Sequence, residues 1–360
     1  MLTFGVEEEY LLIDPVSGVP VPRAAEVLAA AELLPALRPD EAQHELLQVQ
    51  VEVATPVCEE LDEAATHLER LRRAVGTAAR ESGCRIAAVG AAPFAGLTPV
   101  PVTDRARYRS ARAAAPQLVD DLMLNGMHVH VGVPDREQGV AALNRIRPWL
   151  PVLVAMAVNS PFWGGRETGF AGWRTIHFDR WPASGLPPAF ADAADYERRA
   201  QALEDAGLIR DRGGLYWHAR LSEHYPTIEI RATDVQLRVE DAELFAALIR
   251  ALVASALADE RRGAPLPRPD EEMLRAATWQ AAHNGLDGPL VSPAGNRAMA
   301  AEAVVEEFRA YAAPGLMETG DTARADHLLK EFLATGTGAR RQRRAWQEGG
   351  RAGLLDLLLE

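Results

Sequence analysis

Four short segments of the sequence carry Glu, His, Gln or Arg at every second position. Side chains two apart on a β-strand point to the same face of the sheet. The sets are Glu7 and Glu9; Gln48, Gln50 and Glu52; His128 and His130; and Glu229 and Arg231. In the last three segments aliphatic or other apolar residues fill the alternate positions. Each segment therefore predicts a strand with one face of charged or metal-capable groups.

If the four strands share a sheet, these faces converge on one surface. Several carboxylates on one surface repel one another and raise one another's pKa unless a cation is present. Carboxylate oxygens with an imidazole suit Mg²⁺ or Mn²⁺. Taken singly, each pattern is also that of a solvated strand face or an ion pair. The occurrence of all four in one chain favours a metal site.

Other elements must position these strands. Amphipathic patterns predict helices over 24–37, 59–81 and 137–159, the last divided by Pro148 and Pro151. From about residue 240 the chain is predicted to be almost entirely helical. A stretch over 160–192, rich in Gly, Pro, Trp and Arg, has little periodicity. Strands are predicted over 2–13, 45–54, 85–89, 127–133, 216–219 and 226–235.

Composition excludes several classes of protein. The chain has 360 residues and a net charge of −13, which argues against a protein that binds nucleic acid through its phosphates. Two cysteines, Cys58 and Cys84, are too few for a disulfide framework. The first residues are acidic where a signal peptide is basic and then apolar, and no apolar run is long enough to span a bilayer. A cytoplasmic protein that binds neither membrane nor nucleic acid is expected.

Arginine is the cation available for binding an anion, because Lys330 is the only lysine. Its planar guanidinium matches carboxylate and phosphate groups bidentately. Arg166 and Arg174 lie in the aromatic-rich stretch over 160–182, and we expect both to contact anionic groups of ATP or of an acid substrate. Arg220 is expected to contact the nucleotide as well. The alternative is a purely structural role, in which these arginines form ion pairs that hold their loops against nearby carboxylates.

The same segments resemble a known family. Bacterial carboxylate–amine ligases of the glutamate–cysteine ligase type 2 family have motifs similar to FGVEEEYLLID (4–14), VQVEVATPVC (49–58), GMHVHVGV (126–133) and PTIEIRATD (226–234). The resemblance extends to residues 160–182 and 336–343, and so covers essentially the whole chain. The same motifs resemble, more distantly, those of glutamine synthetase.

The resemblance implies a fold of the α+β class. A curved, funnel-like antiparallel sheet of about six strands would have helices on its outer face, as in glutamine synthetase and guanidino kinases. Residues 1–360 would form one catalytic domain, and a homodimer is a further expectation. ATP and glutamate would enter from opposite ends, with divalent metal ions between them.

Carried over position by position, the resemblance also implies roles for residues. The implied metal ligands are Glu7, Glu9, Glu52, His128 and Glu229. His130 resembles a nucleotide contact, and Arg231 resembles the group that faces the transferring phosphoryl, with Glu229 beside it in the catalytic set. Two positions depart from the family pattern: Ala92 stands where a histidine is common, and Asn125 is atypical.

The function implied is ATP-dependent formation of an amide, γ-glutamyl in kind, through an acyl phosphate with release of ADP and phosphate. The substrates are an amino-acid carboxylate and a small-molecule amine, cysteine being one candidate that the sequence does not identify. Three alternatives stay open: a guanidino-type phosphotransferase, an inactive homologue that binds ATP and metal, and a metal hydrolase that uses the histidine pair. The chain has no P-loop, no G-x-S-x-G and no H-E-x-x-H.

Overall fold

An antiparallel sheet of seven strands forms the centre of the computed structural model, which describes residues 2–96 and 98–359. The strand order is β10–β11–β5–β1–β3–β2, and β4 also pairs with β1. About six strands were expected, and the antiparallel pairing throughout this sheet is confirmed. The strands are β1 (Phe4–Ile13), β2 (Ala42–His44), β3 (Gln50–Ala54), β4 (Arg85–Ala87), β5 (Gly126–Gly132), β10 (Ala219–Leu221) and β11 (Thr227–Asp234).

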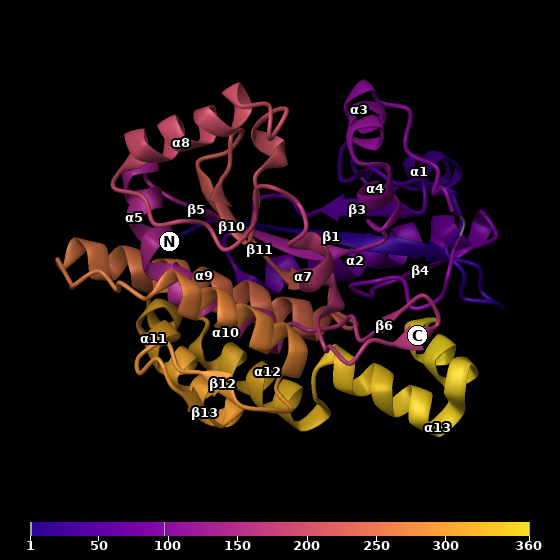
Figure 1. Ribbon diagram of the computed structural model, residues 1–360. Helices are drawn as coiled ribbons and strands as arrows, with labels where there is room; N and C mark the ends of the chain where they lie inside the picture. The colour runs from indigo at the N-terminus through magenta and orange to yellow at the C-terminus, as the bar shows by residue number, and fades with distance from the viewer. Residues whose placement is uncertain (1, 97, 360) are drawn as a thin grey trace.

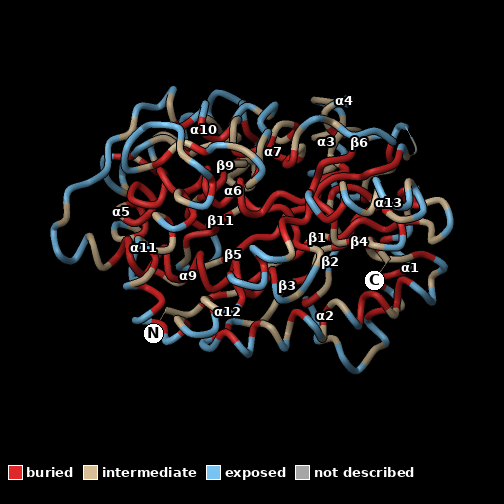
Figure 2. The backbone as a smooth tube through the Cα atoms, turned by 90° about the horizontal axis from the view of Figure 1, so that it is seen from below, coloured by how far each residue is buried: buried red, intermediate tan, exposed pale blue. Residues whose placement is uncertain are grey.

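Helices cover one face of this sheet, as predicted. The α-helices α2 (Leu61–Glu81), α5 (Arg136–Ile146), α6 (Leu150–Met156) and α9 (Val239–Arg261) pack against its strands. Aliphatic side chains that alternate along β5 and β11 join the largest hydrophobic core there. In Figure 1 α9 to α12 lie on the side of the sheet opposite α3 and α8. Figure 2 shows the central strands mostly buried and the connecting segments at the edge exposed.

The middle glutamate of β1 lies on this helix-covered face, unlike its neighbours. Glu8 is fully buried and forms an ion pair with Arg72 of α2, whose Nε donates to Glu8 Oε2 at 2.9 Å. Arg72 Nη2 also donates to the carbonyl oxygen of Gln236 at 2.9 Å, just beyond β11. A slip of one residue along β1 would move Glu8 to the other face and leave Arg72 without its partner. The ion pair therefore favours one register of β1.

The opposite face of the sheet is divided between a polar half and an apolar half. Leu11 and Ile13 continue the face that carries Glu7 and Glu9, but they pack with Leu354 of α13 (Gly338–Leu359) in a second core. The C-terminal helix and the segments that flank β4 thus pack against the far end of this face. The polar side chains occupy the part that this second core leaves open.

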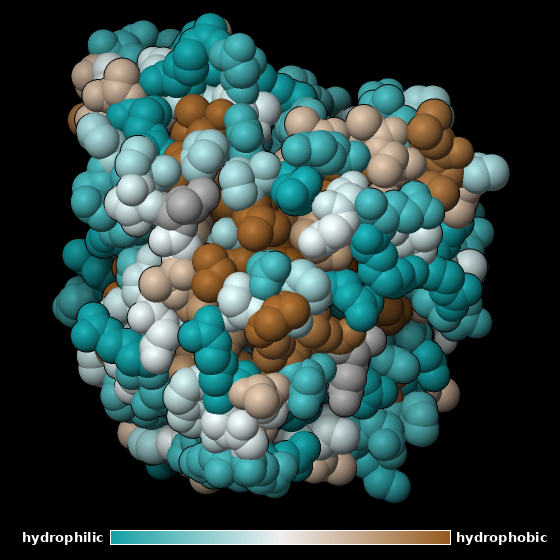
Figure 3. Space-filling view, turned by 90° about the vertical axis from the view of Figure 1, so that its right-hand side faces the viewer, coloured by the Kyte–Doolittle hydropathy of each residue, from teal (hydrophilic) through white to brown (hydrophobic). Residues whose placement is uncertain are grey.

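The C-terminal third is helical, as predicted. It contains α9, α10 (Glu271–Asn284), α11 (Ala301–Thr319), α12 (Thr322–Thr335) and α13, with one short hairpin, β12 (Leu290–Val291) and β13 (Ala298–Met299), between α10 and α11. No helix in the described part of the chain is long and apolar enough to cross a membrane. Hydrophilic residues dominate the face shown in Figure 3, and hydrophobic side chains are grouped near its middle.

Two segments differ from the prediction. The strand expected over 45–54 is broken: β2 and β3 form a hairpin, and residues 45–49 make its turn. The stretch over 160–192 has structure of its own, namely β6 (Phe162–Trp163), β7 (Arg166–Glu167), α7 (Trp173–Phe178) and β8 (Ser184–Gly185). Pro148 and Pro151 do divide their helix, with the 3-10 turn η1 (Arg147–Trp149) between α5 and α6.

The remaining elements lie around the sheet. Residues expected to form one strand near 216 split into β9 (Tyr216–Trp217) and β10, and β9 pairs with β8. The other helices are α1 (Ala24–Glu32), α3 (Ala106–Ala114), α4 (Pro116–Asp120), α8 (Ala193–Asp205) and the 3-10 turn η2 (Arg212–Gly214).

The buried ion pair of Glu8 yields the first testable prediction. Arg72→Met leaves the Glu8 carboxylate buried without its partner, and we expect the free energy of unfolding to fall by about 3–5 kcal/mol. Arg73→Met is the matched control, because Arg73 is the next residue of α2 and pairs with Glu69 at the surface; it should leave stability nearly unchanged. Urea denaturation of both variants measures the difference, and equal losses would contradict the register role of Glu8.

Candidate active site

The register of four strands gathers the polar side chains on one face. Residues directly opposite each other in an antiparallel pair project to the same side of the sheet. Glu7 is opposite His128, Glu9 is opposite Glu52, and Glu229 is opposite His130. These six residues, which the sequence analysis selected, therefore lie together.

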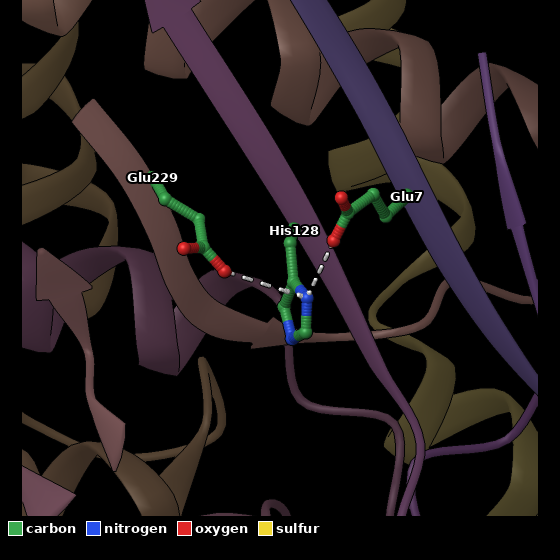
Figure 4. Close-up of side chains that lie close together, drawn as sticks. All are labelled: Glu7, His128 and Glu229. Carbon is green, nitrogen blue, oxygen red and sulfur yellow. Dashed lines mark hydrogen bonds and ion pairs between the residues drawn. The ribbon is translucent and has the colours of Figure 1, made fainter. Parts of the chain in front are cut away.

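One group of three ligand-capable side chains comes from β1, β5 and β11. The His128 ring lies between the carboxylates of Glu7 and Glu229, as Figure 4 shows. Its Nδ1 is 3.2 Å from Glu7 Oε2 and 4.0 Å from Glu229 Oε1. Each of the three offers one atom within 4.8 Å of the others. We call Glu7, His128 and Glu229 the histidine cluster.

A second group consists of three carboxylates. Glu9, Glu45 and Glu52 each offer an oxygen within 4.8 Å of the others, and we call them the carboxylate cluster. The backbone N–H of Gly126 donates to Glu9 Oε2 at 2.5 Å. His128 Nε2 is 3.8 Å from Glu9 Oε1 and has no hydrogen-bond partner among the described residues. The imidazole thus stands between the two clusters.

Glu45 was missed by the sequence analysis. In a continuous strand, Glu45 and Glu52 are seven residues apart and project to opposite faces. The β2–β3 hairpin reverses the chain between them and brings the two carboxylates together. The signal that could have revealed it is the break in the strand itself, because the apolar run Leu46–Leu47 interrupts the alternation.

Burial makes the carboxylate cluster costly to ionise. Burial, with the carboxylate of Glu45 second, raises the pKa of Glu9 to about 7. Burial and the nearby carboxylates of Glu7, Glu45 and Glu9 raise the pKa of Glu52 well above its usual range. The pKa of Glu45 is also raised, chiefly by burial. A cation bound among the three would reverse this penalty.

In the histidine cluster, hydrogen bonds and nearby positive charges outweigh the effect of burial on the carboxylate pKa values. Burial alone would raise the pKa of Glu7, but hydrogen bonds to His128 and His130 outweigh it and hold the pKa well below its usual range. Burial, followed by the charge of Arg231, lowers the pKa of His128 to about 4. His128 is therefore neutral at neutral pH, which is the form of an imidazole that binds a metal ion.

His130 lies at the edge of the histidine cluster. Its Nε2 is 3.3 Å from Glu7 Oε1, and its Nδ1 is 2.9 Å from Thr227 Oγ1. Burial lowers the pKa of His130, but the hydrogen bond to Glu7 outweighs it, so the pKa is raised. The ring of Tyr225, 63% exposed, lies edge-on at 6.2 Å from His130. His130 thus joins the cluster to an exposed aromatic surface.

Two arginines neutralise Glu229. Arg231 Nη1 donates to Glu229 Oε1, and Arg220 Nε donates to Glu229 Oε2 at 2.6 Å. Burial raises the pKa of Glu229, but the charges of Arg231 and Arg220 outweigh it and hold the pKa well below its usual range. Arg220 Nη1 also faces the backbone carbonyls of Arg212, Gly213 and Leu215 at 3.0–3.4 Å. Arg220 Nη2 donates to Glu229 Oε1 at 3.2 Å, so most of the donors of this guanidinium are used inside the fold.

The arginines of the aromatic-rich stretch lie in different environments. Arg174 of α7 is 5% exposed, and its Nη1 and Nη2 are 3.4 and 3.3 Å from the carbonyl oxygen of Arg231. Its Nε has no partner among the described residues. Arg166 is exposed in the β6–β7 hairpin, opposite Trp163. The structure brings Arg174 beside the clusters but leaves Arg166 at the surface.

Two of the expected polar residues are used inside the fold. Gln50 Nε2 donates to Leu124 O at 2.6 Å and to Asn125 Oδ1 at 2.9 Å, and Gln48, which precedes β3, donates to Val102 O at 3.0 Å. Asn125 also donates to Val89 O at 2.8 Å. The unusual Asn125 is thus a buried link between segments, and Ala92 is buried as well.

The donor set fits Mg²⁺ or Mn²⁺. Five carboxylates and one neutral imidazole supply hard oxygen ligands with one nitrogen, and no cysteine takes part. The partnerless Nε2 of His128 and the raised pKa of the carboxylate cluster agree with a bound cation. The two clusters could hold two ions, with His128 between them.

Comparisons with known proteins agree on one family. The family model described as glutamate-cysteine ligase family 2 matches residues 3–356. A protein of Salinispora arenicola (strain CNS-205), "Putative glutamate--cysteine ligase 2", is 43% identical over 343 residues, covering 95% of this chain and 90% of that protein. A protein of Mycobacterium sp. (strain KMS) with a similar name is 39% identical over 360 residues, covering 99% of this chain and 98% of that protein.

Solved structures share the fold at low sequence identity. The glutamate–cysteine ligase of Francisella tularensis in complex with AMP has a TM-score of 0.74 at 11% identity, covering 99% of this chain and 87% of that chain. A bifunctional glutathione synthetase from Pasteurella multocida has a TM-score of 0.68 at 15% identity, covering 99% of this chain and 51% of that chain. The expected sheet-and-helix fold is therefore confirmed.

Metal binding should stabilise the protein. Adding Mg²⁺ or Mn²⁺ at about 100 times its Kd to EDTA-treated protein should increase the free energy of unfolding by roughly 2.7 kcal/mol. Glu45→Gln should weaken this response, because it removes one charged ligand of the carboxylate cluster. Glu69→Gln, on the exposed face of α2, is the control and should respond like the wild type. A melting temperature that ignores added metal would count against the site.

The raised pKa of Glu9 predicts a dependence on pH without metal. Burial raises the pKa of Glu9 to about 7 in the folded protein, against an ordinary value of 4.5. Protonated Glu9 therefore stabilises the fold below pH 4.5. That contribution disappears as the pH rises through 7. In EDTA the wild type should lose about 3 kcal/mol relative to Glu9→Gln between pH 4 and pH 8, at ~1.4 kcal/mol per pKa unit. Parallel stability curves for the two proteins would refute this.

Proposed function

We infer that this chain, which belongs to glutamate–cysteine ligase family 2, is an ATP-dependent carbon–nitrogen ligase that forms an amide from a carboxylate and an amine. The observation that supports this most is the pair of clusters on one sheet face, with Arg231 attached to Glu229. Phosphoryl transfer needs positioned cations around the phosphates and little covalent chemistry from the protein. The two clusters offer ligands for such cations, and Arg231 adds a fixed positive charge.

The reaction proposed has two steps. A carboxylate oxygen of the acid attacks the γ-phosphorus of ATP, and the bond from that phosphorus to the bridging oxygen of ADP breaks. The acyl phosphate formed is a good electrophile. The amine then attacks its carbonyl carbon, phosphate leaves, and the amine loses a proton. One oxygen of the original carboxylate therefore ends in the phosphate.

The side chains of the two clusters would hold divalent ions, and the positive charge of such ions would offset the charge of the phosphates. The chain's own groups do the rest. Arg231, held by Glu229, presents a fixed guanidinium to the oxygens on which charge spreads in the transition state. We assign the nucleotide to the side of His130, beside Tyr225. Arg174 has donors to spare and is assigned to an anionic group of the acid or of ATP.

We propose glutamate as the acid and cysteine as the first amine to test. The names of the relatives support both choices. The test combines purified protein, Mg²⁺, ATP and L-glutamate, with and without L-cysteine, and separates the products by mass spectrometry. A γ-glutamyl amide formed with ADP supports the proposal. A stable phosphorylated product would instead indicate a phosphotransferase, and the absence of any ATP turnover with a panel of acids and amines would contradict enzymatic activity.

Arg231 gives the sharpest kinetic prediction. Arg231→Lys keeps the charge but loses the fork geometry, so kcat should fall by roughly 10²–10³ while ATP still binds. Arg238→Lys is the control, because Arg238 pairs with Glu240 at the surface and should keep the wild-type rate. ADP release measures kcat, and a melting curve on each sample checks folding. A wild-type kcat for Arg231→Lys would remove this residue from the catalytic set.

A further inference from the structure

One buried carboxylate near the site belongs to neither cluster. Asp234 is the last residue of β11 and is 2% exposed. Its Oδ2 accepts hydrogen bonds from the backbone N–H of Asn159 at 2.8 Å and from Ser160 Oγ at 2.7 Å. Its Oδ1 lies 3.9 Å from Arg174 Nη1. Asp234 thus connects the sheet to the beginning of the 160–182 stretch and to α7.

The contacts of Asp234 hold Arg174 at two points. The backbone N–H of Arg174 donates to Ser160 Oγ at 3.0 Å, and that hydroxyl donates to Asp234. At its other end the guanidinium lies between Asp234 Oδ1 and the carbonyl oxygen of Arg231. One carboxylate therefore acts on both the backbone and the side chain of Arg174.

Two glycines provide the space for this pair. A Cβ at Gly126 would overlap Arg174 Nη2, and a Cβ at Gly90 would come within 2.5 Å of Asp234 Oδ2. Gly126 is also the residue whose N–H donates to Glu9. The absence of both side chains lets the guanidinium lie along β5, close to the carboxylate cluster.

Arg174 is held in place but is poorly paired. A guanidinium has five N–H donors, yet Nη1 and Nη2 share one carbonyl at long distance, and Nε has no partner among the described residues. Asp234 Oδ1, at 3.9 Å, offsets the charge of Arg174 but is too far away to accept a hydrogen bond, so the guanidinium keeps donors for a second anion. The contacts of Arg174 fix the direction of its guanidinium before any ligand binds. Such preorganisation favours binding and catalysis.

We propose that Asp234 is a positioning residue for the ligase reaction and acts by aiming Arg174 at an anionic group of the substrate. The inference rests on the proposed function, in which Arg174 binds that group. Asp234 itself touches no substrate. An asparagine would still accept from Asn159 and Ser160 through its oxygen, but its amide would face the guanidinium with a donor.

A double-mutant cycle tests the proposal with Mg-ATP, L-glutamate and L-cysteine. Asp234→Asn should lower kcat/KM for L-glutamate by about 10²-fold, the scale of a misplaced binding group. Arg174→Ala should lower it at least as much. In the Arg174→Ala background, Asp234→Asn should change kcat/KM by less than about two-fold, because its target is gone. An equal loss in both backgrounds would overturn the proposal.

Asp321→Asn is the matched control for stability. Asp321 is 5% exposed and pairs with the buried Arg250 at 3.4 Å, away from the clusters. The melting temperature of Asp321→Asn should fall about as much as that of Asp234→Asn, but its KM for L-glutamate should stay at the wild-type value. A rise in that KM for Asp321→Asn would show that destabilisation alone explains the effect of Asp234→Asn.

A structural measurement separates this proposal from the proposed function. In crystals of Asp234→Asn, the Arg174 guanidinium should leave the Arg231 carbonyl, and amide hydrogen exchange over 172–178 should increase; Asp321→Asn should do neither. An unmoved Arg174 would overturn the positioning role whatever reaction the enzyme catalyses. If the wild type makes no γ-glutamyl amide, the proposed function fails, while the crystal structures still decide the role of Asp234.

Discussion

The repulsion among carboxylates crowded on one sheet face is the constraint on which the rest of the structure depends. Glu7 and Glu229 belong to the histidine cluster, and Glu9, Glu45 and Glu52 form the carboxylate cluster beside it. Ionised carboxylates in a low-dielectric environment are stable only beside positive charge or hydrogen-bond donors. The protein supplies these unequally: Glu229 pairs with two arginines, whereas the carboxylate cluster accepts hydrogen bonds from the backbone N–H groups of Gly126 and Leu46 and from the Gln43 amide. The imbalance favours a cation at the carboxylate cluster.

Regular alternation made much of this site predictable. On β1, β5 and β11 the period of two held, so the side chains of Glu7, His128 and Glu229 share a face as their spacing implied. Glu45 could not be found in that way, because it reaches the site through a turn. The loop arginines were equally undetermined: nothing periodic in 160–182 separates the buried Arg174 from the exposed Arg166. Tertiary packing determines both the position of Glu45 and the burial of Arg174.

The arginines also show how one residue type serves two purposes. Arg72 and Arg220 donate hydrogen bonds to carboxylates and to backbone carbonyls, and these bonds hold β1 and the loop around η2 in place. Arg174 has donors to spare. Because arginine keeps its charge when buried, a chain with one lysine can use it for both framework and ligand. The unpartnered Nε of Arg174, together with its position beside the two clusters, distinguishes it from these framework arginines.

Transfer of oxygen from the acid to phosphate is the measurement that tests the account most directly. L-Glutamate labelled with oxygen-18 in its side-chain carboxylate is turned over with Mg-ATP and L-cysteine, and the inorganic phosphate is analysed by mass spectrometry. An acyl phosphate at this site requires one labelled oxygen in each phosphate released. Phosphate that carries no label while amide accumulates would contradict the account, because the carboxylate would then never have been phosphorylated.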